Sequence, residues 1–544
     1  MKKTILLIFV LSIFMACHNP SKKQSKPKLV VGIVVDQMRY DYLVRFADKY
    51  GEGGFKRLLR EGFSVQNTHY NYIPTYTAVG HTSIFTGTTP INHGIISNNW
   101  YDKYLKKIVY CVDDNNYRTI GNDGEGGRKS PNRQLTTTIT DQLRLAQNMQ
   151  NKTIGVSIKD RAAILPAGHT ANAAYWFDGG AQGTWVSSSY YIKELPNWVQ
   201  EFNKSGKVDA YLSKPWETLY DINTYTESIA DDNNFEGTFN GEEKPVFPHD
   251  IPALRSKNNN YTILKYTPSG NSLTKDFAEA AIIGENLGKS KFTDFLTLSF
   301  SCTDYVGHQY GVASKEIEDT YLRLDKDLES FLQFLDQKIG KGNYTLFLTA
   351  DHAAVQVPAY LQSIKIPAKY FSYVKYEQFI KEVCKKYFKS EDLVENISNF
   401  QIFLNKEKIE SLKLDVNTVA QRLADESISY KGIYKAVTAR TLQTTSFDKG
   451  ILNSLQNGYN QKLSGDVLLV PTPATVSYPK KGTTHGSGYS YDTHVPLIFY
   501  GNGIKQGVSK KEHEITDIAP TIATLLQIEA PNGNTGKVIT EVLK

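Results

Sequence analysis

Long apolar runs recur along the chain and are separated by polar segments with helical spacing. The runs are residues 28–38, 293–304, 343–353 and 494–503, with a further strand that begins at residue 153 and ends near Lys159 and Arg161. A run that is apolar on both faces is typical of a buried strand in a parallel sheet. Helical patterns at 316–338 and 514–528 follow two of these runs. The pattern predicts an α/β fold, in which a central, mostly parallel sheet has helices on both faces.

Two regions depart from this alternation and are interpreted as insertions or caps. Residues from about 178 to 270 are rich in Asn, Gly, Tyr and Pro, and residues from about 355 to 475 mix short helical and strand patterns. A length of 544 residues would by itself suggest several domains. However, candidate site residues lie near both ends of the chain, which predicts a single main domain over residues 28–544.

The first residues have the pattern of an export signal. Two lysines precede an apolar run that ends at Ala16, too short for a permanent membrane span, and a polar tether follows at 17–27. We therefore predict a signal peptide over 1–16 and a periplasmic protein. Cys17 stands where a bacterial lipobox has its lipidated cysteine, whereas Phe14 replaces the usual Leu. Attachment to the outer membrane or cell surface and release into the periplasm both stay open.

Composition and charge narrow the range of partners. The chain is 40% hydrophobic and 22% charged, with a formal charge of +6 and no long basic tract interleaved with aromatic residues. Nucleic acid is therefore not an expected partner, and we expect a monomer that acts on small molecules. The remaining cysteines, Cys111, Cys302 and Cys384, are far apart and form no CxxC pair, so they are expected to be buried, with at most one disulfide.

Three of the apolar runs end in aspartate, and histidines accompany two of them. Asp36 ends the first run, "CTDYVGHQYG" places Asp304 four residues before His308, and "TADHAA" places Asp351 beside His352. A single aspartate after a strand usually caps the next helix. Several at the carboxyl ends of parallel strands are expected to meet at one edge of the sheet.

A further histidine completes a possible set of metal ligands. His485 lies in the Gly- and Thr-rich stretch "KGTTHGSGYSYDTHVPL", just before a predicted strand. Carboxylate oxygens and imidazole nitrogens are both zinc ligands in proteins. The other histidines have no comparable motif and are expected to be structural, with His169 in "LPAGHT" the one of most interest.

The stretch "NYIPTYTAVGHTSIFTG" at 71–87 places Thr77 at the start of a predicted helix among small residues. Thr77 is open to two interpretations. A threonine there is commonly an N-cap, whose hydroxyl accepts hydrogen bonds from backbone N–H groups. The alternative is a nucleophile, because a helix N-terminus attracts anions such as phosphate and a base or metal can activate the hydroxyl.

Taken together, these motifs resemble the alkaline phosphatase superfamily. "PTYTAVGHTSIFTG", "VVDQMRYDYL", "TDYVGHQYG", "TADHA", "GTTHGS" and "SIKDRAAILPAGH" look like the PafA-type alkaline phosphatases of the Bacteroidetes, and the resemblance covers residues 28–544. It implies an alkaline-phosphatase-like sheet and hydrolysis of small phosphomonoesters with two zinc ions as cofactors.

The resemblance also implies a role for each site residue. One zinc would be held by Asp304, His308 and His485, and the second by Asp36, Asp351, His352 and the Thr77 oxygen. Thr77 would be the catalytic nucleophile that forms a phosphothreonine. The residues that would contact phosphoryl oxygens are Asn98, Lys159 and Arg161, of which the last two are expected to face the crevice from one strand. Ala353 replaces a glycine that is frequent after the "ADH" triplet.

Two other functions remain as alternatives. A nucleotide-type phosphodiesterase of the same superfamily shares the threonine and both metal sites but usually lacks the Lys/Arg pair. A catalytically inactive lipoprotein that binds glycans through its 34 tyrosines is the alternative of another class. A sulfatase is excluded, because it would need a cysteine or serine in a modification motif that is absent here.

Overall fold

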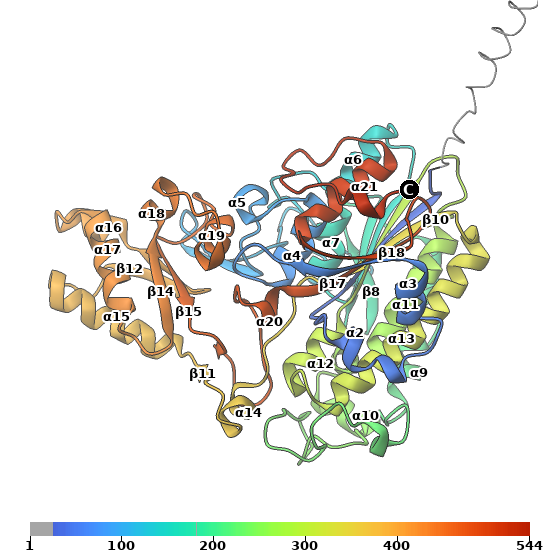
Figure 1. Cartoon of the computed structure of the whole chain (residues 1–544), viewed down its shortest axis with the longest axis horizontal. Helices are drawn as coiled ribbons and strands as arrows, with labels where there is room; N and C mark the ends of the chain where they lie inside the picture. Colours follow the sequence, from blue (N-terminus) through green and yellow to red (C-terminus); the bar gives the residue numbers. More distant parts are fainter. Residues whose placement is uncertain (1–25, 181) are drawn as a thin grey trace, which may run out of the picture.

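The computed structural model describes residues 26–180 and 182–544, so the predicted signal peptide and Cys17 lie outside the described residues. The centre of the molecule is a ten-stranded sheet with the order β18-β2-β17-β10-β1-β9-β6-β7-β8-β5 (Figure 1). Its strands are β1 Leu29–Val35, β2 Phe63–His69, β5 Thr119–Ile120, β6 Thr153–Ser157, β7 Ala173–Asp178, β8 Thr184–Ser188, β9 Asp294–Phe300, β10 Tyr344–Thr349, β17 His494–Gly501 and β18 Gly507–Glu514. The predicted α/β architecture is confirmed.

The middle of the sheet is parallel and buried on both faces, as the apolar runs predict. Strands β10, β1, β9, β6 and β7 pair in parallel, whereas β17 runs antiparallel between β10 and β2. All residues of β1, β9 and β10 are buried. Helices α11 (Ser269–Gly284) and α13 (Lys315–Leu335) cover one face, and α4 (Thr77–Thr86), α7 (Asp160–Ala167) and α21 (Ile518–Leu526) cover the other (Figure 1).

The carboxyl ends of the central strands are level with one another. Val34 of β1 is paired with Thr349 of β10 and with Ser299 of β9, and Ser299 is in turn paired with Ser157 of β6. Each of these strands ends within one residue of that level. The side chains that follow them therefore emerge at the same edge of the sheet, where open α/β folds usually bind ligands.

Helix α4 packs unusually close to this edge. A Cβ atom on Gly80 would lie 2.1 Å from the carbonyl oxygen of Asp351, so only glycine fits there. All ten residues of α4 are buried, and its N-cap is Tyr76 rather than Thr77. The small residues after Thr77 thus allow the helix mouth to reach the loop that follows β10.

One local prediction was wrong. The strand expected to end near Lys159 and Arg161, with both residues facing the crevice from it, ends at Ser157, and helix α7 begins at Asp160. Lys159 is the N-cap of α7, and its backbone N–H donates to Ser157 Oγ over 3.1 Å. Arg161 therefore lies in the first turn of a helix and not on a strand, because the chain turns after Ser157, the last residue of β6.

The first insertion is smaller than expected. Residues 184–188, inside the predicted insertion of 178–270, form β8, which pairs antiparallel with β7 of the main sheet. The remainder consists of short helices and loops between β8 and α11. One of these loops, around residues 228–249, lies against the start of α13 through a hydrogen bond from Ile229 N to Ala313 O.

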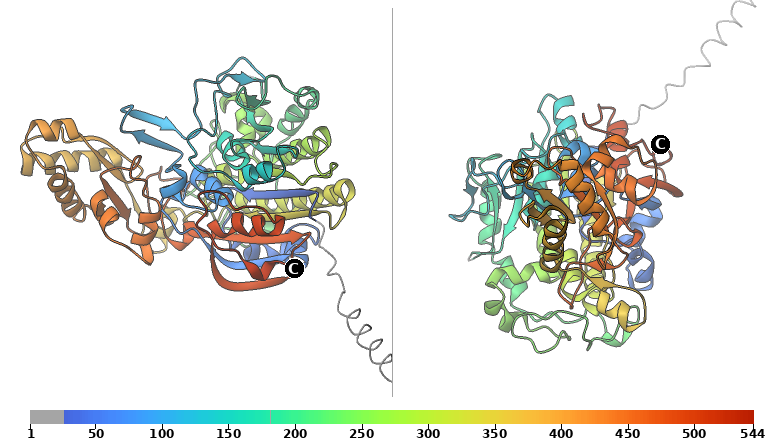
Figure 2. Two further views of the ribbon diagram at one scale, coloured as in Figure 1. Left: turned by 90° about the horizontal axis from the view of Figure 1, so that it is seen from above. Right: turned by 90° about the vertical axis from the view of Figure 1, so that its left-hand side faces the viewer.

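The region 355–475 forms a cap that projects from the main sheet (Figure 2). Four of its strands make a separate sheet in the order β12-β13-β15-β14, with α15 (Tyr373–Phe388) and α17 (Val416–Ser427) packed against it. The strands are β12 Val394–Ser398, β13 Gln401–Leu404, β14 Ile433–Thr438 and β15 Val467–Pro471. Aliphatic and aromatic side chains of these elements give the cap a hydrophobic core of its own.

The three cysteines in the described residues are buried, as predicted. Cys111, Cys302 and Cys384 are buried and, within residues 26–180 and 182–544, form no disulfide. Burial raises the pKa of Cys384 to about 11, so this thiol is protonated at neutral pH. In the same described ranges, the helices are all too short or too polar to cross a bilayer.

Candidate metal centre

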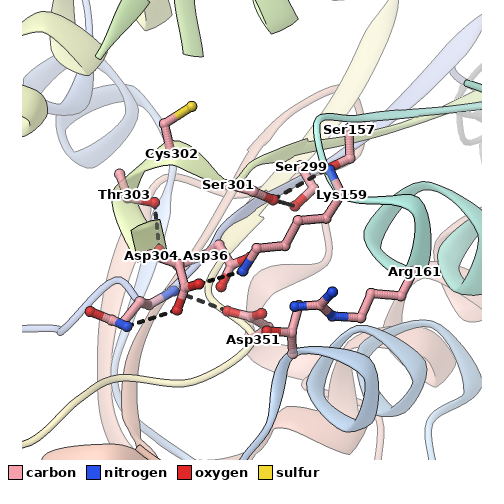
Figure 3. A network of polar contacts seen from close by, with 12 residues as sticks. Asp36, Ser157, Lys159, Arg161, Ser299, Ser301, Cys302, Thr303, Asp304 and Asp351 are labelled. Carbon is pink, nitrogen blue, oxygen red and sulfur yellow. Dashed lines mark hydrogen bonds and ion pairs between the residues drawn. The ribbon is translucent and has the colours of Figure 1, made fainter. Parts of the chain in front are cut away.

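Buried aspartates gather at the carboxyl edge of the sheet (Figure 3). Asp36 follows β1, Asp351 follows β10, and Asp304 lies in the first turn of α12 (Cys302–Tyr310), the helix after β9. All of them are at most 3% exposed. Because the strand ends are level, three apolar runs from distant parts of the chain bring their aspartates into one cluster.

Two groups of side chains in this cluster have metal-ligand spacing. The ligand atoms of Asp36, Asp351 and His352 lie within 4.8 Å of one another, and so do those of Asp304, His352 and His485. His308, one turn after Asp304 on α12, has its Nε2 atom 3.2 Å from Asp304 Oδ1. The six side chains predicted as ligands therefore lie together, with His352 between the two groups.

The buried carboxylates have few hydrogen-bond donors and cations around them. Within the described residues, Asp36 Oδ1 accepts no hydrogen bond, and Asp36 Oδ2 and Asp351 Oδ2 have only ion-pair contacts, such as those with Lys159 and His81. Burial and the neighbouring Asp36 carboxylate raise the pKa of Asp351 well above its usual range. Buried polar groups without partners are costly, and such carboxylates are commonly paired with cations or bound to metals. The donor set of these residues fits divalent metal ions.

The histidines present the correct nitrogen for metal binding. The Nδ1 atoms of His308, His485 and His352 lie 2.7, 2.7 and 3.0 Å from the carbonyl oxygens of Thr483, Thr75 and Ala353. A carbonyl oxygen can only accept, so each Nδ1 carries the proton and the opposite Nε2 has a free lone pair. Burial also lowers the pKa of His352 to about 3, which keeps that imidazole neutral. This arrangement is typical of metal-ligating histidines.

Thr77 is the first residue of α4, and its side chain faces the cluster. Its Oγ1 atom lies 3.4 Å from His352 Nε2, and it makes no capping hydrogen bond within the described ranges. Asn98 lies at the same helix mouth, where its Oδ1 atom accepts a hydrogen bond from Ala78 N over 2.8 Å. A hydroxyl and an amide thus meet at the positive end of the helix dipole.

Lys159 brings a positive charge into the middle of the carboxylates. Its Nζ atom lies 2.9 Å from Asp36 Oδ2, contacts Asp304 Oδ2 and is 4.9 Å from the ring centroid of Tyr305. Burial opposes the charged form, but Asp304 and Asp36 outweigh it and hold the pKa of Lys159 above its usual range. Arg161 extends from α7 toward the same cluster (Figure 3), and its Nη1 atom donates to Tyr110 Oη over 3.0 Å.

Two residues that contact the cluster were not predicted. Gln37, next to Asp36, donates from its backbone to Asp351 Oδ1 (3.1 Å) and from Nε2 to Asp304 Oδ1 (2.7 Å). His81, expected to be structural, has Nδ1 3.2 Å from Asp351 Oδ2. The one available signal for His81 was its position one helical turn after Thr77. His169 lies apart from the cluster and pairs with Asp141 over 3.1 Å.

A buried aspartate outside the predicted set supports both histidine loops. Asp492 Oδ2 accepts hydrogen bonds from Ser487 N (2.8 Å) and Ser487 Oγ (2.6 Å), and Asp492 O accepts one from Ala353 N (2.8 Å). Ser487 lies two residues after His485, and Ala353 directly follows His352. Asp492 therefore fixes the two loops relative to each other. No sequence motif pointed to it, because its partners are defined only by the folded loops.

The chain is similar to known proteins over most of its length. The family model described as type I phosphodiesterase/nucleotide pyrophosphatase matches residues 30–495. The chain is 45% identical to alkaline phosphatase PhoV of Synechococcus elongatus over the full length of both. It is 43% identical to alkaline phosphatase PafA of Elizabethkingia meningoseptica, covering 100% of this chain and 99% of that one. A protein of Myroides odoratus named calcium-transporting ATPase is 48% identical over 96% of each chain.

Solved structures give the same result for the fold. The crystal structure of wild-type alkaline phosphatase PafA superposes with a TM-score of 0.92 at 44% identity, covering 96% of this chain and 99% of that one. A variant of PafA with a threonine, an asparagine, a lysine and an arginine replaced gives the same TM-score. The cap and the main sheet are therefore both present in a solved relative.

We predict that Asp492→Ala weakens metal binding because it frees the loop that follows His485, whose Ser487 loses the Asp492 carboxylate, while the backbone contact to Ala353 is kept. Residues that orient metal ligands typically contribute about 10- to 100-fold in metal affinity, and we expect a loss of that size. Competition with a chelator measures the affinity, and circular dichroism checks the fold. Asp492→Asn keeps an acceptor oxygen and should lose less. Wild-type metal affinity in a folded Asp492→Ala variant would contradict the positioning role.

Proposed function

We propose a phosphate monoesterase activity for this chain, which belongs to the type I phosphodiesterase/nucleotide pyrophosphatase family and, within the alkaline phosphatase superfamily, to the PafA-type alkaline phosphatases. The observation that supports it most directly is the buried Lys159, which lies within contact distance of both Asp36 and Asp304. A cation at this point favours the more highly charged of two phosphate substrates. A monoester carries nearly two negative charges at alkaline pH, and a diester carries one.

The proposed cofactors are two zinc ions. One would be held by Asp304, His308 and His485, and the other by Asp36, Asp351, His352 and Thr77 Oγ1. Support comes from Asp36 Oδ1, which accepts no hydrogen bond within the described residues, and from the Nε2 atoms of the histidines, which face the carboxylates at this edge of the sheet; such a set suits a borderline-soft divalent ion. When bound, such a pair of ions supplies Lewis-acid charge for an in-line displacement at phosphorus.

The chain's own residues would then position the substrate and exchange the phosphoryl group. Thr77 Oγ1 would attack phosphorus, the ester P–O bond would break, and the alcohol would leave. Water would then hydrolyse the phosphothreonine, release phosphate and restore the hydroxyl. Asn98, Lys159 and Arg161 would hold the phosphoryl oxygens. Phosphoryl transfer depends chiefly on such positioning and charge stabilisation.

A nucleotide-type phosphodiesterase remains the second candidate, because the description of the matching family includes that activity. The Lys159–Arg161 pair argues against it as the main activity. The glycan-binding alternative has less support, because an inactive protein has no need of six converging ligands at one buried edge of the sheet.

The proposed location is outside the cytoplasm, in the periplasm or attached through a lipid on Cys17. The basis is the sequence pattern of residues 1–27 alone. We also propose a monomer that needs neither nucleic acid nor a protein partner.

We predict that a strong chelator abolishes activity and that added zinc restores it, since the proposed mechanism depends on six metal ligands. Elemental analysis of the active sample should find about two zinc ions per chain. His485→Ala should reproduce part of the loss, because it removes one ligand. Full turnover in a sample shown to be free of metal would refute the assignment.

We predict that Thr77→Ala loses several orders of magnitude in kcat while the fold is kept, since the nucleophilic oxygen is removed. Thr77→Ser should keep substantial activity, because serine supplies the same oxygen without the methyl group. Steady-state kinetics measure both, and acid quenching with a labelled substrate should trap a phosphoenzyme in the wild type and not in Thr77→Ala. A Thr77→Ala variant with wild-type rates would leave Thr77 a structural role only.

We predict that replacing both Lys159 and Arg161 by Ala lowers kcat/KM for monoesters by a factor on the order of 100, the combined effect of two charge-assisted contacts. Diester hydrolysis should fall much less, because a diester offers less charge to these cations. The measurement is kcat/KM for a matched monoester and diester, with zinc content determined on the same samples.

The control for this double variant is Lys207→Ala, which removes a cation that pairs with Asp276 at the surface. It should change neither activity. Equal proportional losses of both activities would show that the pair supports metal placement instead. A wild-type preference for diesters would favour the second candidate.

A further inference from the structure

A cavity of about 420 Å³ adjoins the metal centre where the cap meets the main domain. The main domain contributes Tyr76, Thr484 and His485 to its wall, and the cap contributes Tyr373 and Phe400. The volume is within the range of small-molecule sites, about 300–1,000 Å³. The cavity therefore has room for an organic group beside a proposed zinc ligand.

The cavity borders the reaction centre through His485. Tyr76 directly precedes Thr77, and its ring meets the ring of His485 edge to face at a centroid distance of 5.7 Å. In an in-line displacement the leaving group lies opposite the nucleophile. Thr77 Oγ1 is next to His352, so the leaving group is expected toward His485, which lines this cavity.

The chemistry of the wall selects flat and uncharged groups. Tyr76, Tyr373, Phe400 and Tyr491 present aromatic rings, and serine, threonine and asparagine side chains lie between them. The carboxylate of Asp492 also lines the cavity, with its Oδ2 atom bonded to Ser487. Among the described residues, neither lysine nor arginine lines the cavity. Aromatic walls bind planar rings by stacking and by burial of apolar surface. A second phosphate group would find no cation there.

The turn that carries Phe400 is held in a strained conformation next to the phosphoryl-binding segment. Asn399 and Phe400 have φ angles of 51° and 55°, which are unfavourable for a bulky residue such as phenylalanine. Asn399 Nδ2 donates to Asn99 O over 2.6 Å, and Phe400 N donates to Tyr373 Oη over 3.1 Å. Positive φ at both turn residues is the favoured geometry of a two-residue hairpin, here between β12 and β13. The hairpin and its two hydrogen bonds hold Phe400 at the cavity wall.

We propose that this cavity binds the leaving group of the substrate and that the enzyme prefers phosphomonoesters whose alcohol contains a flat, uncharged ring. Nucleoside monophosphates and aryl phosphates share this chemistry. The inference rests on the proposed monoesterase function and extends it from the phosphoryl group to the alcohol. Phe400 is its specificity-determining residue.

The test compares Phe400→Ala with the wild type on esters of matched reactivity. Adenosine 5′-monophosphate and glycerol 3-phosphate are both primary alkyl esters, so they differ mainly in the ring. We expect kcat/KM for the nucleotide to fall about five- to tenfold, the loss of one aromatic contact, and that for glycerol phosphate to change less than about twofold. Phenyl phosphate should fall like the nucleotide if any flat ring is recognised. A fall in kcat/KM for the nucleotide but not for phenyl phosphate would restrict the preferred substrates to nucleoside monophosphates.

A binding measurement provides a second readout. In a Thr77→Ala background, isothermal titration should show that Phe400→Ala weakens phenyl phosphate but leaves the affinity for inorganic phosphate unchanged. Phe400→Leu keeps apolar volume without a ring and covers the case in which Phe400→Ala does not fold. The control is Tyr387→Ala, which removes a partly exposed aromatic from α15 of the same cap and should change no ester.

Different results would overturn the leaving-group site and the proposed monoesterase activity. Equal losses for adenosine 5′-monophosphate and glycerol phosphate, or equal weakening of phenyl phosphate and inorganic phosphate, would overturn the leaving-group site. A wild type that hydrolyses no monoester would refute the monoesterase, and the titration would still decide whether Phe400 contacts a ring.

Discussion

Mutual repulsion among buried aspartates is the constraint around which this molecule is arranged. Asp36, Asp304 and Asp351 are removed from water at one edge of the sheet, and each would be costly to ionise there alone. Lys159 supplies one compensating charge from within the cluster, and Gln37 joins two of the aspartates by hydrogen bonds. Divalent metals would supply the rest. The sheet, its level strand ends and the close approach of α4 all serve to hold these groups in place.

The imidazoles illustrate how the backbone takes part in that arrangement. Each proposed histidine ligand has its Nδ1 atom directed at a carbonyl oxygen, so the tautomer is set by the main chain rather than by another titratable group. The loops that provide these carbonyls are in turn fixed by Asp492 and Thr75. Thr75 Oγ1 donates to Ser487 O, and Thr75 O receives the His485 Nδ1–H. The geometry of the centre is thus a property of the whole fold.

The sequence predicted the parts of this structure that depend on local pattern. Strands apolar on both faces, and the aspartates that end them, follow directly from the order of residues, so β1, β9 and β10 were foreseen. The register that brings the ends of these strands level depends on pairing between distant segments. The sequence pattern predicted parallel strands but not this register. Arg161 was misplaced on a strand because an apolar run does not reveal that Ser157 turns the chain into α7. The roles proposed for the site residues came from the resemblance to a family, because residue spacing alone does not assign them.

Contacts between segments that lie far apart in the chain could not be predicted from the local sequence pattern. Gln37, His81 and Asp492 are ordinary polar residues in the sequence, and only the fold places them against the cluster. Strand β8 was assigned to an insertion, since nothing in its five residues shows that β7 is its partner. The position of the cap relative to the centre, and hence the cavity at Phe400, also depends on packing between segments that lie far apart in the chain.

The antiparallel strand β17 determines when the centre can exist during synthesis. It is inserted between β10 and β2, and the loop that precedes it contains His485 and the partners of Thr75. A nascent chain that has not yet emerged as far as Gly501, the end of β17, has a gap in its sheet between β10 and β2. The sheet edge that carries the aspartates is therefore completed late in synthesis.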